Sequence, residues 1–180
     1  MQNFSIMKDN FSTQAATYAQ FRPRYTDNTF RPILDLCAEK ETAWDCGTGN
    51  GQAAIILAQH FQKVMATDIS QKQIDNATKS GNIFYSIASA ENAHFDKNSF
   101  DLIIVAQAAH WFNFEKFYSN VNHFLKADGI IALVGYGIHS INPGIDEIVN
   151  HFYSETIGVY WDAERKHIEQ HYATIPFPFE

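Results

Sequence analysis

The sequence predicts a doubly wound α/β fold built on a mainly parallel sheet, and three observations lead to this prediction. Short apolar runs alternate with segments of helical periodicity, as in consecutive βαβ units with right-handed crossovers. The run 100–106 is almost continuously apolar, which is typical of a strand buried on both faces of a parallel sheet. Glycines at 47, 49 and 51 separate an apolar run from a helical pattern, as at the opening of a βαβ unit.

The expected elements follow one another from the N-terminus. Ser12 is expected to cap a helix that ends before Pro23, and Asn28 or Thr29 to cap a second helix with Pro32 in its first turn. Strands are expected at residues 42–45, 63–68, 82–88, 100–106 and 130–136. The remaining helices are expected at residues 53–58, at 71–79 behind a Ser70 cap, at 114–127, at 143–156 behind an Asn142 cap, and from Asp162 through Tyr172.

Length and charge argue against several classes of protein. The 180 residues suit a single domain with a sizeable core. Lys and Arg total 13 against 20 for Asp and Glu, and the net charge of −7 argues against a nucleic-acid partner. The longest apolar stretches, 102–106 and 130–134, are far shorter than the ~20 residues that span a membrane, so no membrane partner is expected. With two cysteines and no visible signal peptide, the expected location is cytoplasmic.

The residues around the glycine loop indicate what kind of ligand it would hold. A dinucleotide fingerprint needs glycine at the position of Gln52, and Gly51 comes one residue too early. Asp45 would repel a pyrophosphate but favours a ligand with an amine or another positive centre. Asp68 ends the next strand, about 20 residues beyond the loop, where an acid accepts hydrogen bonds from ribose hydroxyls. The expected ligand therefore carries ribose and a positive charge but no phosphate.

The segments Asp45–Gly51 and Asp68–Ser70 resemble the cofactor site of class I S-adenosylmethionine-dependent methyltransferases. Further segments are similar to the trans-aconitate methyltransferase-like branch of that family: 11–25, 89–91, 99–103, 107–112, 160–165 and 176–179. The resemblance implies a Rossmann-like fold, S-adenosyl-L-methionine as the cofactor, and methyl transfer to a small-molecule acceptor, for which a carboxylate is a candidate.

The same resemblance implies roles for individual residues. Asp45 would lie near the amino group of the methionine moiety, Arg22 would pair with its carboxylate, and Asp68 would bind the ribose. The residues expected to bind the cofactor are Tyr18, Arg22, Asp45, Gly47, Thr48, Gly49, Gly51, Asp68, Ile69, Ala90, Glu91 and Gln107. Each also has a structural alternative, such as a turn for the glycines, a helix cap for Asp45 or a surface charge for Arg22.

His110 is the candidate general base, although a histidine beside Trp111 and Phe112 is more often packed and hydrogen-bonded than catalytic. A carboxylate acceptor would need no base. The other histidines show no metal-ligand spacing, so no metal is expected. Arg165 could guide an anionic acceptor, or pair with Glu169 four residues later.

The chain is expected to form a single methyltransferase domain in three parts. Residues 1–40 would lie over the cofactor, 41–137 would form the cofactor-binding core, and 138–180 would form a helical segment on the acceptor side that is incomplete. Because family members usually carry two further strands, the sheet is expected to lack its C-terminal strand pair, leaving an open edge where a homodimer could form. The alternatives are an NAD-dependent oxidoreductase, a non-catalytic protein that binds an adenosyl ligand, and a structural interaction module.

Overall fold

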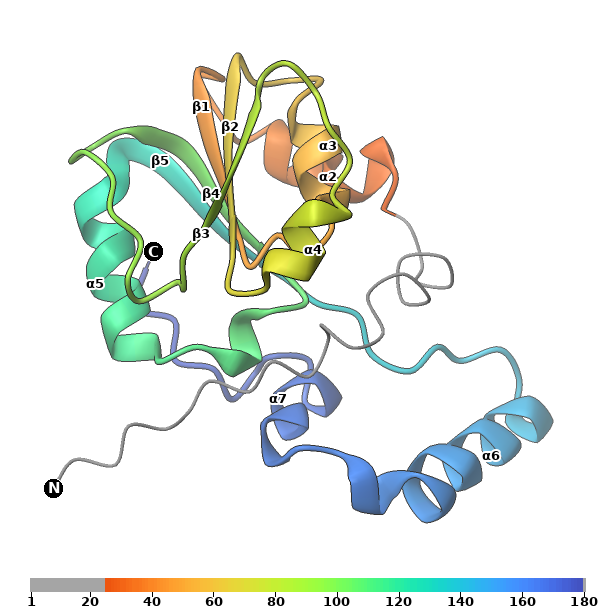
Figure 1. Cartoon of the computed structure of the whole chain (residues 1–180). Helices are drawn as coiled ribbons and strands as arrows, with labels where there is room; N and C mark the ends of the chain where they lie inside the picture. Colours follow the sequence, from red (N-terminus) through yellow and green to blue (C-terminus); the bar gives the residue numbers. More distant parts are fainter. Residues whose placement is uncertain (1–24, 180) are drawn as a thin grey trace, which may run out of the picture.

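The structure, a computed structural model, describes residues 25–179 and is organised around a five-stranded parallel sheet (Figure 1). Its strands are β1 (Thr42–Cys46), β2 (Lys63–Asp68), β3 (Ile83–Ile87), β4 (Phe100–Ala106) and β5 (Leu125–Val134). They lie in the order β3-β2-β1-β4-β5, and every neighbouring pair is parallel. The winding reverses between β1 and β4, which confirms the predicted doubly wound fold.

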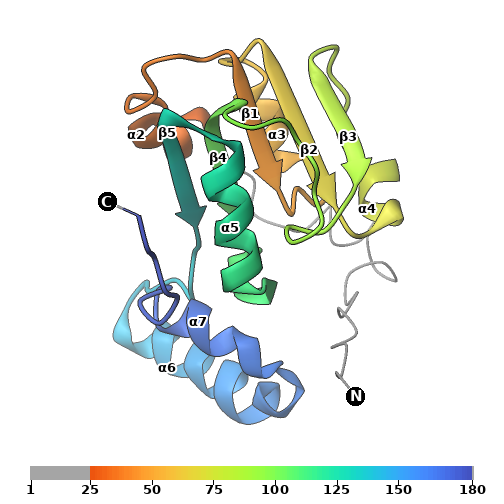
Figure 2. The ribbon, with the colours of Figure 1, turned by 90° about the vertical axis from the view of Figure 1, so that its left-hand side faces the viewer.

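Helices cover both faces of this sheet. One face carries α2 (Asp27–Leu34), α3 (Gln52–Leu57) and α4 (Gln71–Asp75), and the other carries α5 (Phe114–Phe124). Figure 2 shows α6 (Pro143–His151) and α7 (Lys166–Glu169) beyond the arrowheads of the strands, past their carboxyl ends. The C-terminal helical segment therefore lies at the end of the sheet where parallel α/β folds bind their ligands.

Two hydrophobic clusters fill the space between the sheet and its helices. Alternate strand residues point to opposite faces, so Ala43 packs towards α2 and α3 while Trp44 packs towards α5. Trp44 is fully buried, and its indole N–H donates to the Thr67 hydroxyl at 3.0 Å. Its ring centroid lies within 6.5 Å of four phenylalanine rings, those of Phe95, Phe100, Phe117 and Phe124.

Asp101 joins the beginnings of three strands. Its Oδ2 accepts the backbone N–H groups of Glu41 (3.0 Å) and Thr42 (2.9 Å), and its Oδ1 accepts the Lys126 ammonium at 2.8 Å. Burial acts to raise the pKa of the Asp101 carboxyl, but the hydrogen bonds from Lys126 and the two backbone groups outweigh it, so the pKa is lowered. The ionised carboxylate thus ties β1 and β5 to β4.

The start of α2 differs from the prediction. The helix is capped by Thr26 rather than by Asn28 or Thr29, which places Pro32 in its second turn instead of its first. Thr26 is extended (φ −114°, ψ 164°), and its N–H donates to the Thr29 hydroxyl at 3.2 Å. Thr29 therefore acts inside the first turn, as the partner of the cap.

The Ser70 cap is confirmed, because its hydroxyl accepts the Gln73 N–H at 3.4 Å, but α4 ends at Asp75 instead of continuing to residue 79. Asn76 follows the helix with φ −91° and ψ 4°, and its side-chain amide donates to the Lys72 carbonyl at 2.7 Å. This bond satisfies a carbonyl of the last turn and ends the helix early.

The boundary between α5 and β5 was also predicted wrongly. The helix ends at Phe124 and the strand begins at once at Leu125, five residues before the predicted start, and ends at Val134. Leu125 pairs with Phe100, and the register then shifts before Leu102 pairs with Ile130. Gly129 lies in the shifted segment, where a Cβ would come within 2.9 Å of the Phe100 carbonyl oxygen.

In the C-terminal segment the helices begin where the sequence predicts, but their lengths differ from the prediction. Asn142 caps α6, which continues as a π-helical turn, η3 (Phe152–Thr156), to the predicted end. Asp162 precedes the short helix η5 (Ala163–Arg165) and then α7, which ends at Glu169 and so stops before Tyr172.

No residue after Val134 in the described range forms a strand, so the expected absence of a C-terminal strand pair agrees with the observed sheet. Within residues 25–179, β5 pairs only with β4, and dimerisation through its other edge stays a prediction. The three-part division of the domain also stays a prediction. Among the described helices, none has both the length and the apolar character needed to cross a membrane.

Replacing Asp101 by asparagine should lower the free energy of unfolding by about 1–3 kcal/mol at pH 7, because an amide cannot accept all three donors. Urea unfolding measures the loss, with the exposed Asp128→Asn as the matched control. Because the folded pKa lies below the ordinary value of 3.8, the contribution is complete above that value and is lost as the pH falls through the folded pKa. The two variants should therefore converge in acid. Equal stabilities at pH 7 would contradict the role of Asp101.

Candidate functional site

The carboxyl ends of β1, β2, β3 and β4 bring the predicted site residues to one edge of the sheet. Asp45 lies next to the end of β1, Asp68 ends β2, and Gln107 follows β4 directly. Because β1 pairs with both β2 and β4, these residues flank the point at which the winding reverses. Parallel α/β sheets bind ligands in the crevice at this point.

The glycine loop after β1 has a backbone that ordinary residues rarely adopt. All three glycines have positive φ values: Gly47 (73°), Gly49 (56°) and Gly51 (82°). A Cβ on Gly51 would lie 2.2 Å from the Tyr85 hydroxyl oxygen, whereas a Cβ on Gly49 would meet no atom of residues 25–179 within 4 Å. Tyr85 thus closes off Gly51, while no residue in the described range closes off Gly49.

Asp45 is a buried acid, only 1% exposed, with one unsatisfied oxygen. Its Oδ2 accepts the Thr48 hydroxyl at 2.5 Å, while Oδ1 has no hydrogen-bond partner among residues 25–179. Burial raises the pKa of Asp45 to about 7, although the Thr48 hydroxyl and the Ala54 backbone N–H act in the opposite direction. A cationic or N–H donor group would relieve both the unsatisfied oxygen and the cost of the buried charge.

Asp68 connects the glycine loop to the start of α4. Its Oδ2 accepts the Gly49 N–H at 2.8 Å, and its Oδ1 accepts the Ser70 N–H at 2.9 Å. Both oxygens thus support the loop and the start of α4, and ribose binding by Asp68 stays a prediction. The neighbouring Ile69 is 39% exposed, as an apolar wall beside a ligand would be.

The residues after β3 have structural contacts of their own. Glu91 accepts the Asn113 N–H at 2.8 Å and so holds the start of α5. The carbonyl of the buried Ala90 accepts the side-chain amide of Asn120 at 2.8 Å. Both residues lie at the predicted edge, but the hydrogen bonds described above join them to α5, and adenine binding by them stays a prediction.

Gln107 has a strained backbone at the end of β4, with a φ of 56°. Its N–H donates to the Val134 carbonyl at 2.8 Å, and its side-chain amide donates to the Tyr136 carbonyl at 2.7 Å. The side chain is therefore held against the end of β5, and the strained main chain is the part that turns towards η2 (Ala109–Trp111).

His110, in η2, is only 6% exposed. Its Nδ1 lies 3.2 Å from the Tyr172 hydroxyl, and its ring centroid lies 4.8 Å from that of Trp111. These are the contacts of a packed, hydrogen-bonded histidine, and a role as general base stays a prediction. Tyr18 and Arg22 lie outside the described residues. Over residues 25–179, no group of three His, Cys, Asp or Glu side chains could hold a metal ion.

Sequence reasoning missed Tyr85, which fixes the far side of the glycine loop. Its hydroxyl sits over Gly51 and donates to the Thr78 carbonyl at 2.6 Å, and the Thr78 N–H donates to the Asn50 carbonyl at 3.2 Å. Burial and the charge of Asp45 raise the pKa of Tyr85 to about 12, so the hydroxyl stays protonated. Strand alternation could have placed Tyr85 on the face of Ile83, but not over the loop.

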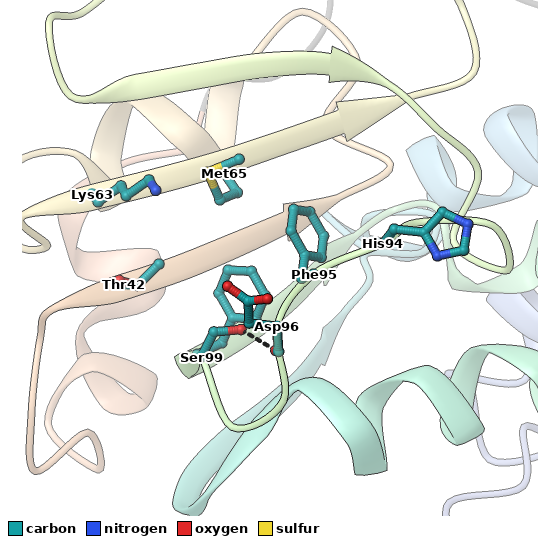
Figure 3. A pocket seen from close by; sticks show the side chains of 8 residues that line it. Thr42, Lys63, Met65, His94, Phe95, Asp96 and Ser99 are labelled. Carbon is teal, nitrogen blue, oxygen red and sulfur yellow. Dashed lines mark hydrogen bonds between the residues drawn. The ribbon is translucent and has the colours of Figure 1, made fainter.

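A cavity of about 410 Å³ lies away from this site, at the amino ends of the strands. Figure 3 shows Thr42 and Met65 on one side of it, from β1 and β2, and Phe95 on the other, from the segment that joins β3 to β4. Thr42 and Lys63 are the first residues of their strands, so this cavity and the acids at the carboxyl ends are separate features.

Comparisons with known proteins agree on one family. Residues 44–133 match a family model described as a methyltransferase domain.

A methyltransferase-family protein of Dictyostelium discoideum is 42% identical over 96% of this chain and 67% of its own length. The Saccharomyces cerevisiae protein CRG1, described as an S-adenosylmethionine-dependent methyltransferase, is 26% identical over 89% of this chain and 55% of its own length. A solved type II methyltransferase of Anaeromyxobacter dehalogenans has a TM-score of 0.80 at 36% identity, covering 89% of this chain and 68% of that one. The chain thus spans about two thirds of the first relative and little more than half of the second.

Gly51→Ala should destabilise the protein by about 1–3 kcal/mol more than Gly81→Ala, because it adds a Cβ at positive φ against the Tyr85 hydroxyl. Gly81 is the control, since its φ is not positive and nothing lies within 4 Å of a Cβ there. The cost of Gly51→Ala should fall in a Tyr85→Phe background, which removes the closest atom. Thermal or urea unfolding of the parent protein and the four variants measures these costs, and equal costs at the two glycines would contradict this description of the loop.

Proposed function

Because the chain belongs to the class I S-adenosylmethionine-dependent methyltransferase family, we propose that it transfers a methyl group from S-adenosyl-L-methionine to a small-molecule acceptor. We assign it to the trans-aconitate methyltransferase-like branch and propose a carboxylate as the acceptor group, from the sequence segments that resemble that branch. The observation that carries the proposal is the pair of acids at adjacent strand ends beside the glycine loop, one of them buried with an oxygen that has no partner among residues 25–179.

The described residues supply contacts that suit each part of this cofactor. Asp45 would accept from the ammonium group, Asp68 from the ribose hydroxyls, and Gly49 would let the ligand approach the backbone. The further proposed cofactor-binding residues are Tyr18, Arg22, Gly47, Thr48, Gly51, Ile69, Ala90, Glu91 and Gln107. All of those within residues 25–179 lie on the loop or at the carboxyl ends of strands β2 to β4.

S-adenosyl-L-methionine supplies a methyl group on a positively charged sulfur, which leaves as a neutral thioether. Held by Asp45 and Asp68, it would supply this methyl group to a lone pair of the acceptor, and the electrons of the broken carbon–sulfur bond would pass to sulfur. The chain's own task is to hold the acceptor in line and to exclude water, and positioning of this kind can contribute about 7–11 kcal/mol. A carboxylate acceptor needs no base, which suits a His110 already engaged with Tyr172.

Membership of the family removes the NAD-dependent oxidoreductase alternative. Two alternatives stay open: a protein that binds the adenosyl ligand without turnover, and a structural interaction module, which would bind no adenosyl ligand. Turnover assays with small acids, phenols and amines separate the first of these from the enzyme.

S-adenosylhomocysteine should raise the melting temperature of the protein, whereas NAD should not. Asp68→Ala should weaken the binding of S-adenosylhomocysteine by about 1–3 kcal/mol in calorimetry, because the ribose hydroxyls lose their acceptor. Asp75→Ala, in the nearby α4, is the matched control, since Asp75 is exposed and accepts a hydrogen bond from the Gln71 side chain one turn away. No stabilisation by the ligand, or unchanged affinity in Asp68→Ala, would refute the assignment.

The affinity for S-adenosylhomocysteine should rise with pH up to about 7, because the ligand ammonium pairs with ionised Asp45 and the free carboxyl must first lose its proton. Calorimetry at pH 6.5 in buffers of different ionisation enthalpy should therefore detect proton release. Adenosine, which has no ammonium group, should show no such dependence, and neither should Asp45→Asn with either ligand.

The stability of the free protein should follow the opposite trend. Because the folded pKa of Asp45 lies above the ordinary value of 3.8, its contribution is fully present below that value and is lost as the pH rises through about 7. For the binding experiment, an affinity for adenosine that changes with pH as the affinity for S-adenosylhomocysteine does would contradict the placement of the ammonium group beside Asp45.

A further inference from the structure

The C-terminal helical segment contains a second cavity, of about 460 Å³. It is lined by residues of η3, of the short helix η4 (Gly158–Tyr160), of η5 and of α7. Its lining combines two aromatic rings, from Tyr153 and Trp161, with two cations, from Arg165 and Lys166. Ligand sites of small organic molecules have volumes and mixtures of groups of this kind.

The Arg165 guanidinium is held in a fixed position. Its central carbon lies 4.1 Å from the Trp161 ring centroid and 5.1 Å from that of Tyr153. Its Nε donates to the Tyr153 hydroxyl, and that hydroxyl donates in turn to Glu169 Oε1 at 3.0 Å. The Trp161 indole N–H donates to the Tyr153 carbonyl at 3.2 Å, which fixes the second ring against the first. The guanidinium thus needs no ordering when a ligand arrives.

This contact network leaves the outer part of the guanidinium without an acid. Within residues 25–179, no carboxylate lies within 4.0 Å of an Arg165 nitrogen, although the chain carries 20 acidic residues against 13 basic ones. Glu169, the predicted i,i+4 partner, is reached only through Tyr153. The two terminal nitrogens of a guanidinium form a planar fork that matches the two oxygens of a carboxylate.

The cavity lies at the end of the sheet that carries the candidate cofactor site. The short helix η5, which contains Arg165, contacts η2, and η2 follows Gln107 at the end of β4. The Tyr172 hydroxyl, beyond α7, lies 3.2 Å from His110 Nδ1 in the same η2. In Figures 1 and 2 helices α6 and α7 lie beyond the carboxyl ends of the strands.

We propose that this cavity binds an organic acid with one carboxylate on the Arg165 fork and a planar or apolar part against Trp161. The lining contains the acids Asp162 and Glu169 as well as two cations, so a single carboxylate fits the site better than a phosphate or a polyanion. The identification of this acid as the methyl acceptor rests on the proposed function, whereas its binding at Arg165 does not require methyl transfer.

The three tryptophan indole N–H signals allow a direct test by NMR with cinnamate as the probe. Cinnamate should shift the Trp161 signal in a saturable way and leave the signal of the fully buried Trp44 unchanged. Arg165→Gln should weaken the binding about 10- to 100-fold, because a charged hydrogen-bond pair is lost. Arg31→Gln, an exposed arginine on α2, should leave it unchanged, and the neutral analogue cinnamamide should not bind.

The melting temperature shows whether each variant is folded. Should Arg165→Gln fail to fold, Arg165→Lys keeps the charge but loses the fork, and it should also weaken the binding. Equal affinity in a folded Arg165 variant, equal binding of cinnamamide or inorganic phosphate, or an unmoved Trp161 signal would overturn the inference. Binding of S-adenosylhomocysteine without cinnamate would defeat this inference alone, and binding of cinnamate without S-adenosylhomocysteine would defeat the proposed methyl transfer alone.

Discussion

The parallel alignment of β1 with both β2 and β4 is the constraint on which the rest of the structure depends. It gathers the amino ends of the strands at one side, where Asp101 binds the chain at three points, and the carboxyl ends at the other. The buried acids at the two ends of the strands therefore differ in their hydrogen bonding. The acid at the amino ends is satisfied by the protein itself, whereas Asp45 at the carboxyl ends keeps an oxygen without a partner in the described range. A buried acid without a hydrogen-bond partner lowers the stability of the fold. Such acids are most often found at sites where a bound ligand supplies the missing partner.

Unusual backbone conformations occur at the same edge. The three loop glycines and Gln107 all have positive φ, and they follow the two strands between which the winding reverses. The loop is also braced from outside, by Asp68 at Gly49 and by Tyr85 at Gly51. A strained main chain held on both sides loses little further freedom when a ligand binds, so the rigid sheet effectively prepares the site in advance.

Hydrophobic patterning was sufficient to predict the sheet, because burial on both faces leaves a continuous apolar run such as 100–106, and β4 has those limits. The early end of α4 was not predictable in this way, because it depends on one side-chain bond from Asn76. The start of β5 depends on a register shift that only the paired strand reveals. At the site, the positions of Asp45 and Asp68 follow from sequence order and parallel pairing, whereas Tyr85 and the Tyr172–His110 contact join residues far apart in sequence. The stacking of Arg165 on Trp161 was not predictable from spacing either. Spacing alone had suggested an ion pair between Arg165 and Glu169.

The phenolic oxygen above Gly51 has a consequence for how this chain can diverge. A side chain at position 51 cannot be accommodated while a tyrosine occupies position 85, because the two would claim the same volume. Residues 51 and 85 are therefore expected to co-vary among homologues, with a non-glycine residue at the first accompanied by a smaller residue at the second. Substitutions at these two positions are therefore expected to occur together and not independently.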